Sequence, residues 1–207
     1  MNTATRSAAF VSLLLLLPAP IGAQSAHDIL AAQLGLQPPS GGAVEIRVWV
    51  ESNARVDQMY RVIKLDSAVS VERFAFAEVV HPPNGFLTAK EAERETKTNR
   101  HLLQKERCAA KLVETPDYMA CRVALDQAGP WSVLFDDLLP DQLRTLAPQP
   151  RPGCESLVVL DGETVTIDVF ESAGRHTVAY SNPDVCCPTV GCAIADRALS
   201  LVRKNIR

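Results

Sequence analysis

The chain has 207 residues, of which 21 are Lys or Arg and 24 are Asp or Glu, so its formal net charge is −3 at neutral pH. Because a protein that coats nucleic acid is normally basic, we expect no nucleic-acid partner. Apolar residues make up 47% of the chain and charged residues 22%, which excludes a largely disordered protein and indicates a buried core. The length fits one domain of ordinary size.

The first 23 residues have the region order of a secretory signal peptide. Arg6 precedes an apolar run over residues 8–17, and small residues then lead to Ala23. The apolar run is about half as long as a helix that crosses a bilayer. The sequence therefore predicts a signal peptide over residues 1–23, cleaved after Ala23 or, alternatively, after Ala26. We expect a periplasmic or secreted product with no integral membrane segment after leader removal.

Six cysteines follow the leader, and an even number in an exported chain favours disulfide bonds. They are Cys108, Cys121, Cys154, Cys186, Cys187 and Cys192. Cys108 lies near the end of a predicted helix and Cys121 in the strand after it, so a helix-to-strand disulfide is predicted. Cys186 and Cys187 are neighbours whose side chains diverge in extended backbone, so we expect different partners for them, chosen from Cys154 and Cys192.

A zinc site is the alternative to disulfides for the last cysteines. Its ligands would be Cys186, Cys187 and Cys192 with either Cys154 or His176. The chain has no C-x-x-C spacing, and oxidation competes with thiolate ligation outside the cytosol. We therefore expect disulfides, no metal site and no cofactor.

The first half of the mature chain predicts a strand meander followed by a charged helix. Residues 24–42 end in a cluster of prolines and glycines and are predicted as a flexible N-terminal segment, which leaves 43–207 as a single domain. Period-2 alternation predicts strands over 44–50, 59–65 and 69–80. Thr88 and Glu91 have the spacing of a capping box at the start of a helix over 88–113. Between residues 90 and 111 this helix has three more bases than acids, so it either forms a solvated face or meets an anionic partner.

The second half repeats the alternation of strands and helices. Strand patterns over 118–125, 156–160, 163–170 and 175–181 surround a short helix that begins near Trp131, and Asp161-Gly162 is a two-residue hairpin signal. In the strand over 163–170, Val165, Ile167 and Val169 are predicted to face the core and the residues between them to face outward. Helical spacing over 194–202 predicts a C-terminal helix.

The common catalytic and phosphate-binding motifs are absent from the sequence, so we consider a binding surface first. Arginines and aromatic residues on predicted strands can bind an anionic or glycan-like partner if they share an open sheet face. The candidate binding residues are Arg47, Trp49, Arg175, His176 and Tyr180. Protection of sheet edges and cross-strand pairing explain the same residues without a ligand.

Two other functions remain open from the sequence. One is an envelope hydrolase with a site assembled from distant residues, for which His176, Tyr180 and Asp168 are the candidates. The other is a secreted enzyme inhibitor that presents an edge strand or the loop over residues 81–85.

A short D-G hairpin at Asp161-Gly162, a strand that ends in Tyr180-Ser181-Asn182-Pro183, and a C-terminal amphipathic helix resemble uncharacterised exported bacterial proteins. The strand over residues 45–50 is similar to their opening strand. The resemblance implies an exported protein with this order of elements, and it implies no activity.

These patterns together predict one disulfide-linked α+β domain in the order βββ-α-β-α-βββ-α, with helices packed on one face of an antiparallel sheet. The leading functional hypothesis is a non-enzymatic exported module that binds an as yet unknown protein or envelope partner.

Overall fold

A computed structural model describes residues 25–52, 55–82, 87–109, 112–125, 129–147, 162–183 and 189–206. The strands are β1 (Val44–Ser52), β2 (Arg55–Leu65), β3 (Ala68–Glu78), β4 (Val113–Glu114), β5 (Tyr118–Arg122), β6 (Glu163–Glu171) and β7 (Gly174–Ser181). The helices are α1 (Ala26–Gln33), α2 (Ala89–Gln104), α3 (Trp131–Asp137), α4 (Pro140–Leu143) and α5 (Val190–Asn205).

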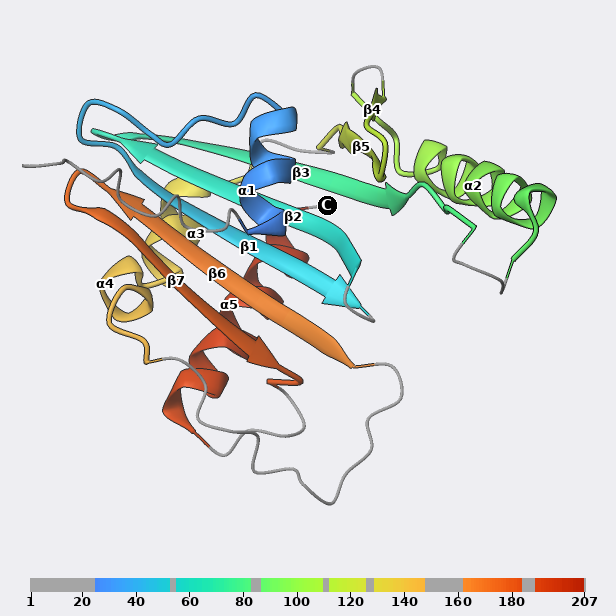
Figure 1. Cartoon of the computed structure of the whole chain (residues 1–207). Helices are drawn as coiled ribbons and strands as arrows, with labels where there is room; N and C mark the ends of the chain where they lie inside the picture. The colour runs from blue at the N-terminus through green and yellow to red at the C-terminus, as the bar shows by residue number, and fades with distance from the viewer. Residues whose placement is uncertain are drawn as a thin grey trace, which may run out of the picture.

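The strands form one antiparallel sheet in the order β4-β5-β3-β2-β1-β6-β7, which confirms the predicted α+β class (Figure 1). The predicted hairpin across Asp161-Gly162 lies partly outside the described residues, since Asp161 and the strand before it are not among them. β6 already pairs with β1 on one side and with β7 on the other. The strand predicted over 156–160 lies outside the described residues.

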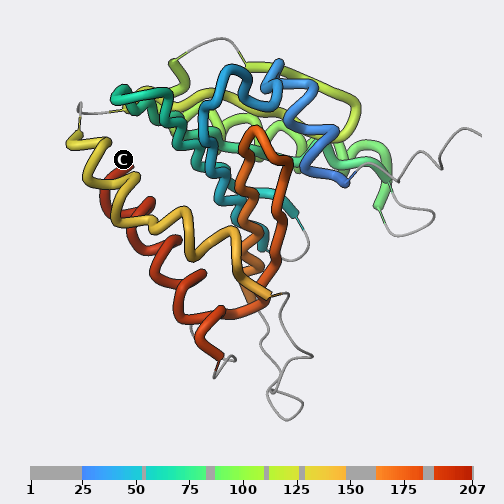
Figure 2. Tube along the Cα trace, turned by 90° about the vertical axis from the view of Figure 1, so that its left-hand side faces the viewer, coloured from blue at the N-terminus to red at the C-terminus, as the bar shows by residue number. Residues whose placement is uncertain are grey.

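The face of the sheet that carries Ile46, Val48 and Val50 holds the main core, and we call it the helical face. α3, α4 and α5 pack against it, as Figure 2 shows for the yellow and red segments. Ala195, Ala198 and Val202 are the buried side of α5, which follows the helical spacing expected from the sequence. This core confirms that helices cover a sheet face.

α1 lies against the opposite face, which we call the α1 face (Figure 2). The sequence predicts a flexible segment over 24–42, whereas residues 26–33 form a helix with Leu30 and Ala31 buried against Trp49. Ser25 caps the helix by accepting a hydrogen bond from the Asp28 amide. One helix therefore packs on the second face, in addition to those on the first.

Because α1 and its linker cover that face, polar strand residues predicted to face outward are buried. Thr166 is 4% exposed and Asp168 is completely buried. Glu45 and Arg47 on the neighbouring β1 are buried as well. The period-2 alternation is right, but the second face is not open to solvent along these strands.

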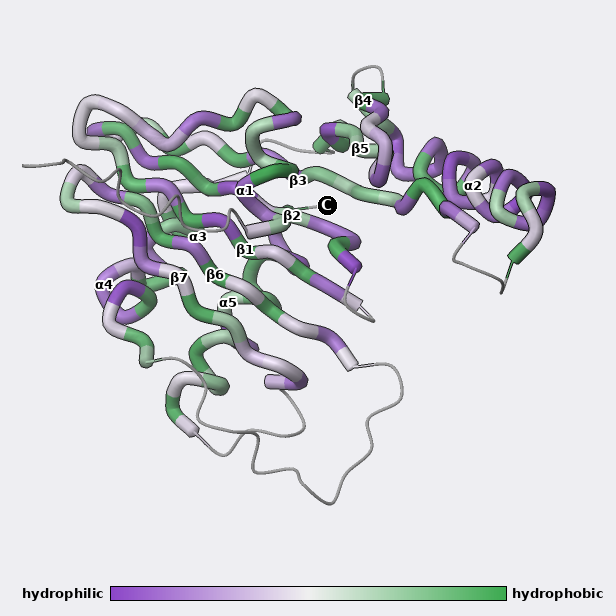
Figure 3. The backbone as a smooth tube through the Cα atoms, in the orientation of Figure 1, coloured by the Kyte–Doolittle hydropathy of each residue, from purple (hydrophilic) through white to green (hydrophobic). Residues whose placement is uncertain are grey.

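α2 extends away from the sheet edge formed by β3, β4 and β5 (Figure 1). The capping box is confirmed, since Thr88 and Glu91 hydrogen-bond each other at the helix start. The helix is coloured mostly hydrophilic in Figure 3, and only Ala92 and Leu103 are buried. Leu103 packs against Ala75, so the last turn of α2 is its main anchor on the sheet.

A disulfide joins Cys108 to Cys121, as predicted, at a sequence separation of 13. Cys192 in the first turn of α5 is also disulfide-bonded. The remaining three cysteines, Cys154, Cys186 and Cys187, lie outside the described residues, so the pairing predicted for them stays a prediction.

Candidate functional site

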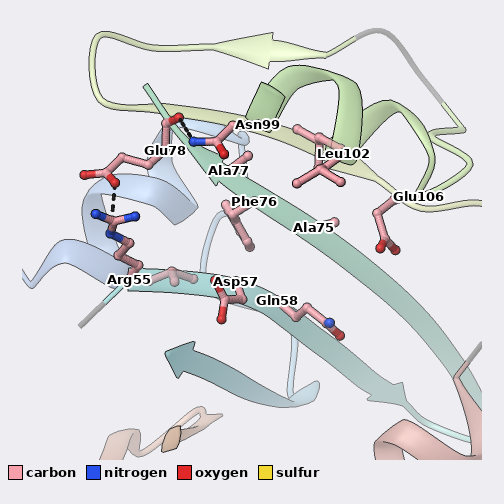
Figure 4. Close-up of a pocket in the computed structure, with 12 residues that line it drawn as sticks. Arg55, Asp57, Gln58, Ala75, Phe76, Ala77, Glu78, Asn99, Leu102 and Glu106 are labelled. Atoms are coloured by element: carbon pink, nitrogen blue, oxygen red, sulfur yellow. Dashed lines mark hydrogen bonds and ion pairs between the residues drawn. The ribbon is translucent and has the colours of Figure 1, made fainter. Parts of the chain in front are cut away.

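A strip of the helical face between α2 and the end of α5 is left uncovered, and we call it the central groove. It consists of two adjoining cavities of about 270 Å³ and about 390 Å³, which share Gln58 and Glu106 as lining residues. Figure 4 shows the smaller cavity, with Leu102 and Glu106 of the α2 region opposite Gln58 of β2. At the far end of that cavity Arg55 forms an ion pair with Glu78.

The larger cavity is the basic half of the groove. Among the described residues that line it, four bases stand against one carboxylate, Glu106. The bases are Arg73 of β3, Lys105 and Arg107 directly after α2, and Arg203 of α5. They come from three separate segments of the chain, so the folded sheet and helices are needed to bring them together.

The floor of the basic half is a hydrogen-bonded pair on β2. The Tyr60 hydroxyl donates to Gln58 Oε1 at 2.6 Å. Burial raises the pKa of the Tyr60 phenol, so this hydroxyl stays protonated at neutral pH and remains a donor. Arg203 pairs with Glu163, and that hydrogen bond raises the pKa of the Arg203 guanidinium.

Arg73 and Glu106 form the central ion pair of the groove. Arg73 Nη2 donates to Glu106 Oε2 at 2.8 Å. Arg73 Nε is buried and has no hydrogen-bond partner among the described residues. Because a buried donor without a partner is uncommon in native proteins, the unmet Nε marks a position where an additional acceptor would be favourable.

Backbone contacts fix the segment that carries Lys105, Glu106 and Arg107. The Ala124 amide donates to the Arg107 carbonyl at 2.9 Å, and the Ala109 amide donates to the Arg122 carbonyl at 2.7 Å. Arg107 has a φ of +59°, a left-handed conformation that is uncommon for a residue with a side chain. The Cys108–Cys121 disulfide holds the next residue against β5. The basic side chains are therefore presented from a constrained turn.

Three of the predicted binding residues lie together on the α1 face and not in the groove. Arg47 and Arg175 place their guanidinium groups 4.4 Å and 5.1 Å from the ring centroid of Phe170. They line a cleft of about 500 Å³ beneath α1. Trp49, which is buried, stacks on His27 of α1 with ring centroids 4.5 Å apart.

Carboxylates already neutralise the arginines of this cleft. Arg47 pairs with Glu45, and Arg175 pairs with both Asp28 and Asp168. Burial by itself lowers the pKa of the Arg175 guanidinium, but the nearby Asp168 carboxylate raises it, and the resulting pKa lies above the ordinary value. Arg47 is 3% exposed, so the open sheet face that would make it a binding residue is absent here. The cleft thus has the character of a buried polar network that ties α1 to the sheet.

His176 and Tyr180 lie on the helical face, on the other side of the sheet from the arginine cleft. The His176 ring makes a 2.9 Å hydrogen bond to the Leu146 carbonyl, and the Tyr180 hydroxyl donates to the Ala147 carbonyl at 2.6 Å. Both side chains hold the backbone that follows α4. Asp168 points to the α1 face, so the three candidates for a hydrolase site do not converge.

No cluster of three or more metal-ligating side chains occurs within the described ranges. Over the same part of the chain, none of the helices combines the length and apolar character needed to traverse a bilayer. Comparison with known proteins finds no matching family model, no matching curated protein and no matching solved structure. Part of the loop considered for an inhibitor, residues 83–85, lies outside the described residues.

Sequence reasoning missed the groove residues Tyr60, Glu106 and Arg203 as members of a site. The signal that pointed toward it was the local excess of bases over residues 90–111, which includes Lys105 and Arg107. That signal indicates a basic helix but no pocket, because the other residues that line the cavity come from β2, β3 and α5.

Proposed function

We propose that this protein is an exported, non-enzymatic binding module that holds an anionic group of an envelope or protein partner in the basic half of the central groove. The observation that supports it most directly is the convergence of Arg73, Lys105, Arg107 and Arg203 around one cavity of about 390 Å³. A cavity of this size lies in the range of ordinary ligand sites, which is about 300–1,000 Å³.

The chemistry of the lining suits an anion. Guanidinium groups bind carboxylate and phosphate through paired, charge-assisted hydrogen bonds, and Lys105 adds a point charge. The Tyr60 hydroxyl and the Gln58 amide add neutral polar groups to the floor. Because the chain as a whole is acidic, this local excess of bases concentrates anions at one place on an otherwise repelling surface.

Export is part of the proposal and is supported by two features. The first 23 residues have the pattern of a signal peptide, and the Cys108–Cys121 disulfide is typical of an oxidising compartment. The constrained turn after α2 depends on that disulfide, so an oxidising environment would also favour the binding site.

The test is isothermal titration calorimetry, in which the mature chain is titrated with inorganic pyrophosphate and, separately, with citrate at low ionic strength. We compare the wild type with the double variant Lys105→Ala/Arg107→Ala. The matched control is Lys90→Ala/Arg94→Ala, which removes the same charge from the exposed start of α2. Both pairs are exposed, so neither variant removes buried packing.

We expect saturable binding that weakens about tenfold in the groove variant, since one charge-assisted contact is worth about 1.5–3 kcal/mol before screening. The control is expected to change affinity less than about threefold, by screened charge alone. Equal losses in the two variants, or no saturable binding of either anion by the wild type, would contradict the proposal.

A further inference from the structure

Glu106 occupies the anion position beside Arg73 in the basic half of the groove, so the protein supplies its own counter-ion there. Glu106 is the single carboxylate among the described residues that line the basic half, and it lies between Lys105 and Arg107 in the sequence. Its carboxylate takes one donor of Arg73, the Nη2 group, at 2.8 Å. The Nε group of the same guanidinium stays without a partner among the described residues.

On the basis of the function proposed above, we propose that the basic half binds a phosphoryl dianion, which displaces the Glu106 carboxylate from Arg73. An oxygen pair of the phosphoryl group then accepts hydrogen bonds from Arg73 Nε and Nη2, in the paired geometry that a guanidinium favours. Lys105, Arg107 and Arg203 surround the remaining oxygens. No covalent bond forms or breaks in this exchange.

The charge of the ligand decides whether it can displace Glu106. Glu106 is tethered beside Arg73 by the chain, so it competes at the high effective concentration of an intramolecular group. A monocarboxylate brings Arg73 the same single negative charge that Glu106 already supplies. A phosphate monoester carries between one and two negative charges at neutral pH, so it gains extra attraction from the other bases that line the cavity, of which Arg203 is already paired with Glu163. The site is therefore selective for a phosphoryl group over a carboxylate.

The displaced Glu106 carboxylate can reach solvent. Its side chain is 39% exposed, so its carboxylate can turn to water at small cost. Glu106 also borders the smaller cavity, into which it points from the α2 side in Figure 4. The Arg73 side chain is 16% exposed and is fixed on β3, so the cation stays in place while the carboxylate moves.

The test uses phenyl phosphate and benzoate, which share a ring and differ in the anionic group. Each is titrated into the mature wild type and into Glu106→Gln, a variant that keeps the shape of the side chain and removes its charge. The charge-matched control is Glu95→Gln, on the exposed surface of α2. Inorganic pyrophosphate is titrated in parallel, so that binding of multivalent anions is known independently.

We expect the wild type to bind phenyl phosphate at least about tenfold more tightly than benzoate. Glu106→Gln is expected to tighten phenyl phosphate binding about fivefold, and Glu95→Gln less than twofold. The gain from Glu106→Gln is expected to disappear in an Arg73→Lys background, because lysine lacks the guanidinium fork. A general effect of net charge would survive that substitution.

The outcomes separate the two proposals. Pyrophosphate binding that depends on Lys105 and Arg107, together with no effect of Glu106→Gln, would overturn this inference and leave the proposed function standing. Equal affinity for phenyl phosphate and benzoate would do the same. Absence of saturable binding for every anion would overturn both. Inorganic phosphate is titrated as a further probe. Tighter binding of inorganic phosphate than of phenyl phosphate indicates a site for the free ion, and the reverse order indicates a site for a phosphate ester.

Discussion

Asp168 is the residue whose removal tests most sharply how the polar network of the α1 face holds β1, β6, β7 and α1 together. It is completely buried on β6 and accepts four hydrogen bonds. The donors are Trp49 Nε1 at 2.8 Å, Arg175 Nε and Nη2 at 3.0 Å and 2.8 Å, and Thr177 Oγ1 at 2.7 Å. Asp168→Ala removes all four acceptor contacts with one substitution.

The magnitude follows from what the substitution leaves behind. The indole N–H of Trp49 becomes an unpaired donor in a fully buried side chain, which costs about 1–3 kcal/mol. Breaking a fully buried ion pair costs about 3–5 kcal/mol, but Arg175 is 27% exposed and keeps Asp28 as a partner, so only part of that cost applies. We expect a total loss of about 3 kcal/mol in the free energy of unfolding.

The assay is equilibrium unfolding of the protein in urea, monitored by tryptophan fluorescence with the disulfides intact. Thr177→Val serves as the control, because it removes a single donor to Asp168 from an exposed position and should cost about 1 kcal/mol or less. A loss below about 1 kcal/mol for Asp168→Ala would contradict the estimate of about 3 kcal/mol, because the network would then contribute no more than surface contacts do.

Further predictions concern a carboxylate, a disulfide and a helix cap. The hydrogen bond from His27 lowers the pKa of Glu51 below its ordinary 4.5, so the stability it supplies is present above that pH and is lost as pH falls through the lower folded value. Glu51→Gln should therefore be less stable than the wild type at pH 7 in urea titrations, and the gap should close in strong acid. Cys108→Ser with Cys121→Ser should lower the free energy of unfolding by about 3 kcal/mol, by the loop-entropy relation, and an unchanged urea midpoint would oppose this. Thr88→Ala should cost about 1 kcal/mol and speed hydrogen exchange in the first turns of α2, whereas unchanged exchange there would show that the cap is unimportant.

The sequence predicts most strands well because their apolar residues alternate strictly. β1 and β6 each bury three aliphatic side chains on the helical face, and that pattern alone fixes which side of the strand meets the core. The α2 start is equally clear, since the Thr88 and Glu91 capping box is a local interaction that needs no tertiary partner.

The same alternation misled the prediction for the second face. Polar residues between aliphatic ones indicate a solvated face, and Asp168 and Glu45 fit that pattern. They are buried because Arg175 and Arg61 neutralise them and because α1 covers the strands. Charge pairing across strands is a long-range property, so periodicity within one strand does not contain it.

The candidate site was least accessible to sequence reasoning. The bases of the groove come from β3, from the turn after α2 and from the end of α5, and no local motif connects Arg73 with Arg203. Arg47 and Arg175 do lie together on the α1 face, but that face is not the open one that the binding hypothesis required. There, however, they meet carboxylates, and the cavity with an excess of bases lies on the other side of the sheet.

The most direct test of anion binding in the central groove is nuclear magnetic resonance of the ¹⁵N-labelled protein during titration with phenyl phosphate. We expect a saturable change that is largest at the Arg73 Nε–H group and at the backbone amides of Lys105 and Arg107. Changes concentrated around Arg47 and Arg175, or changes that do not saturate, would contradict anion binding in the groove.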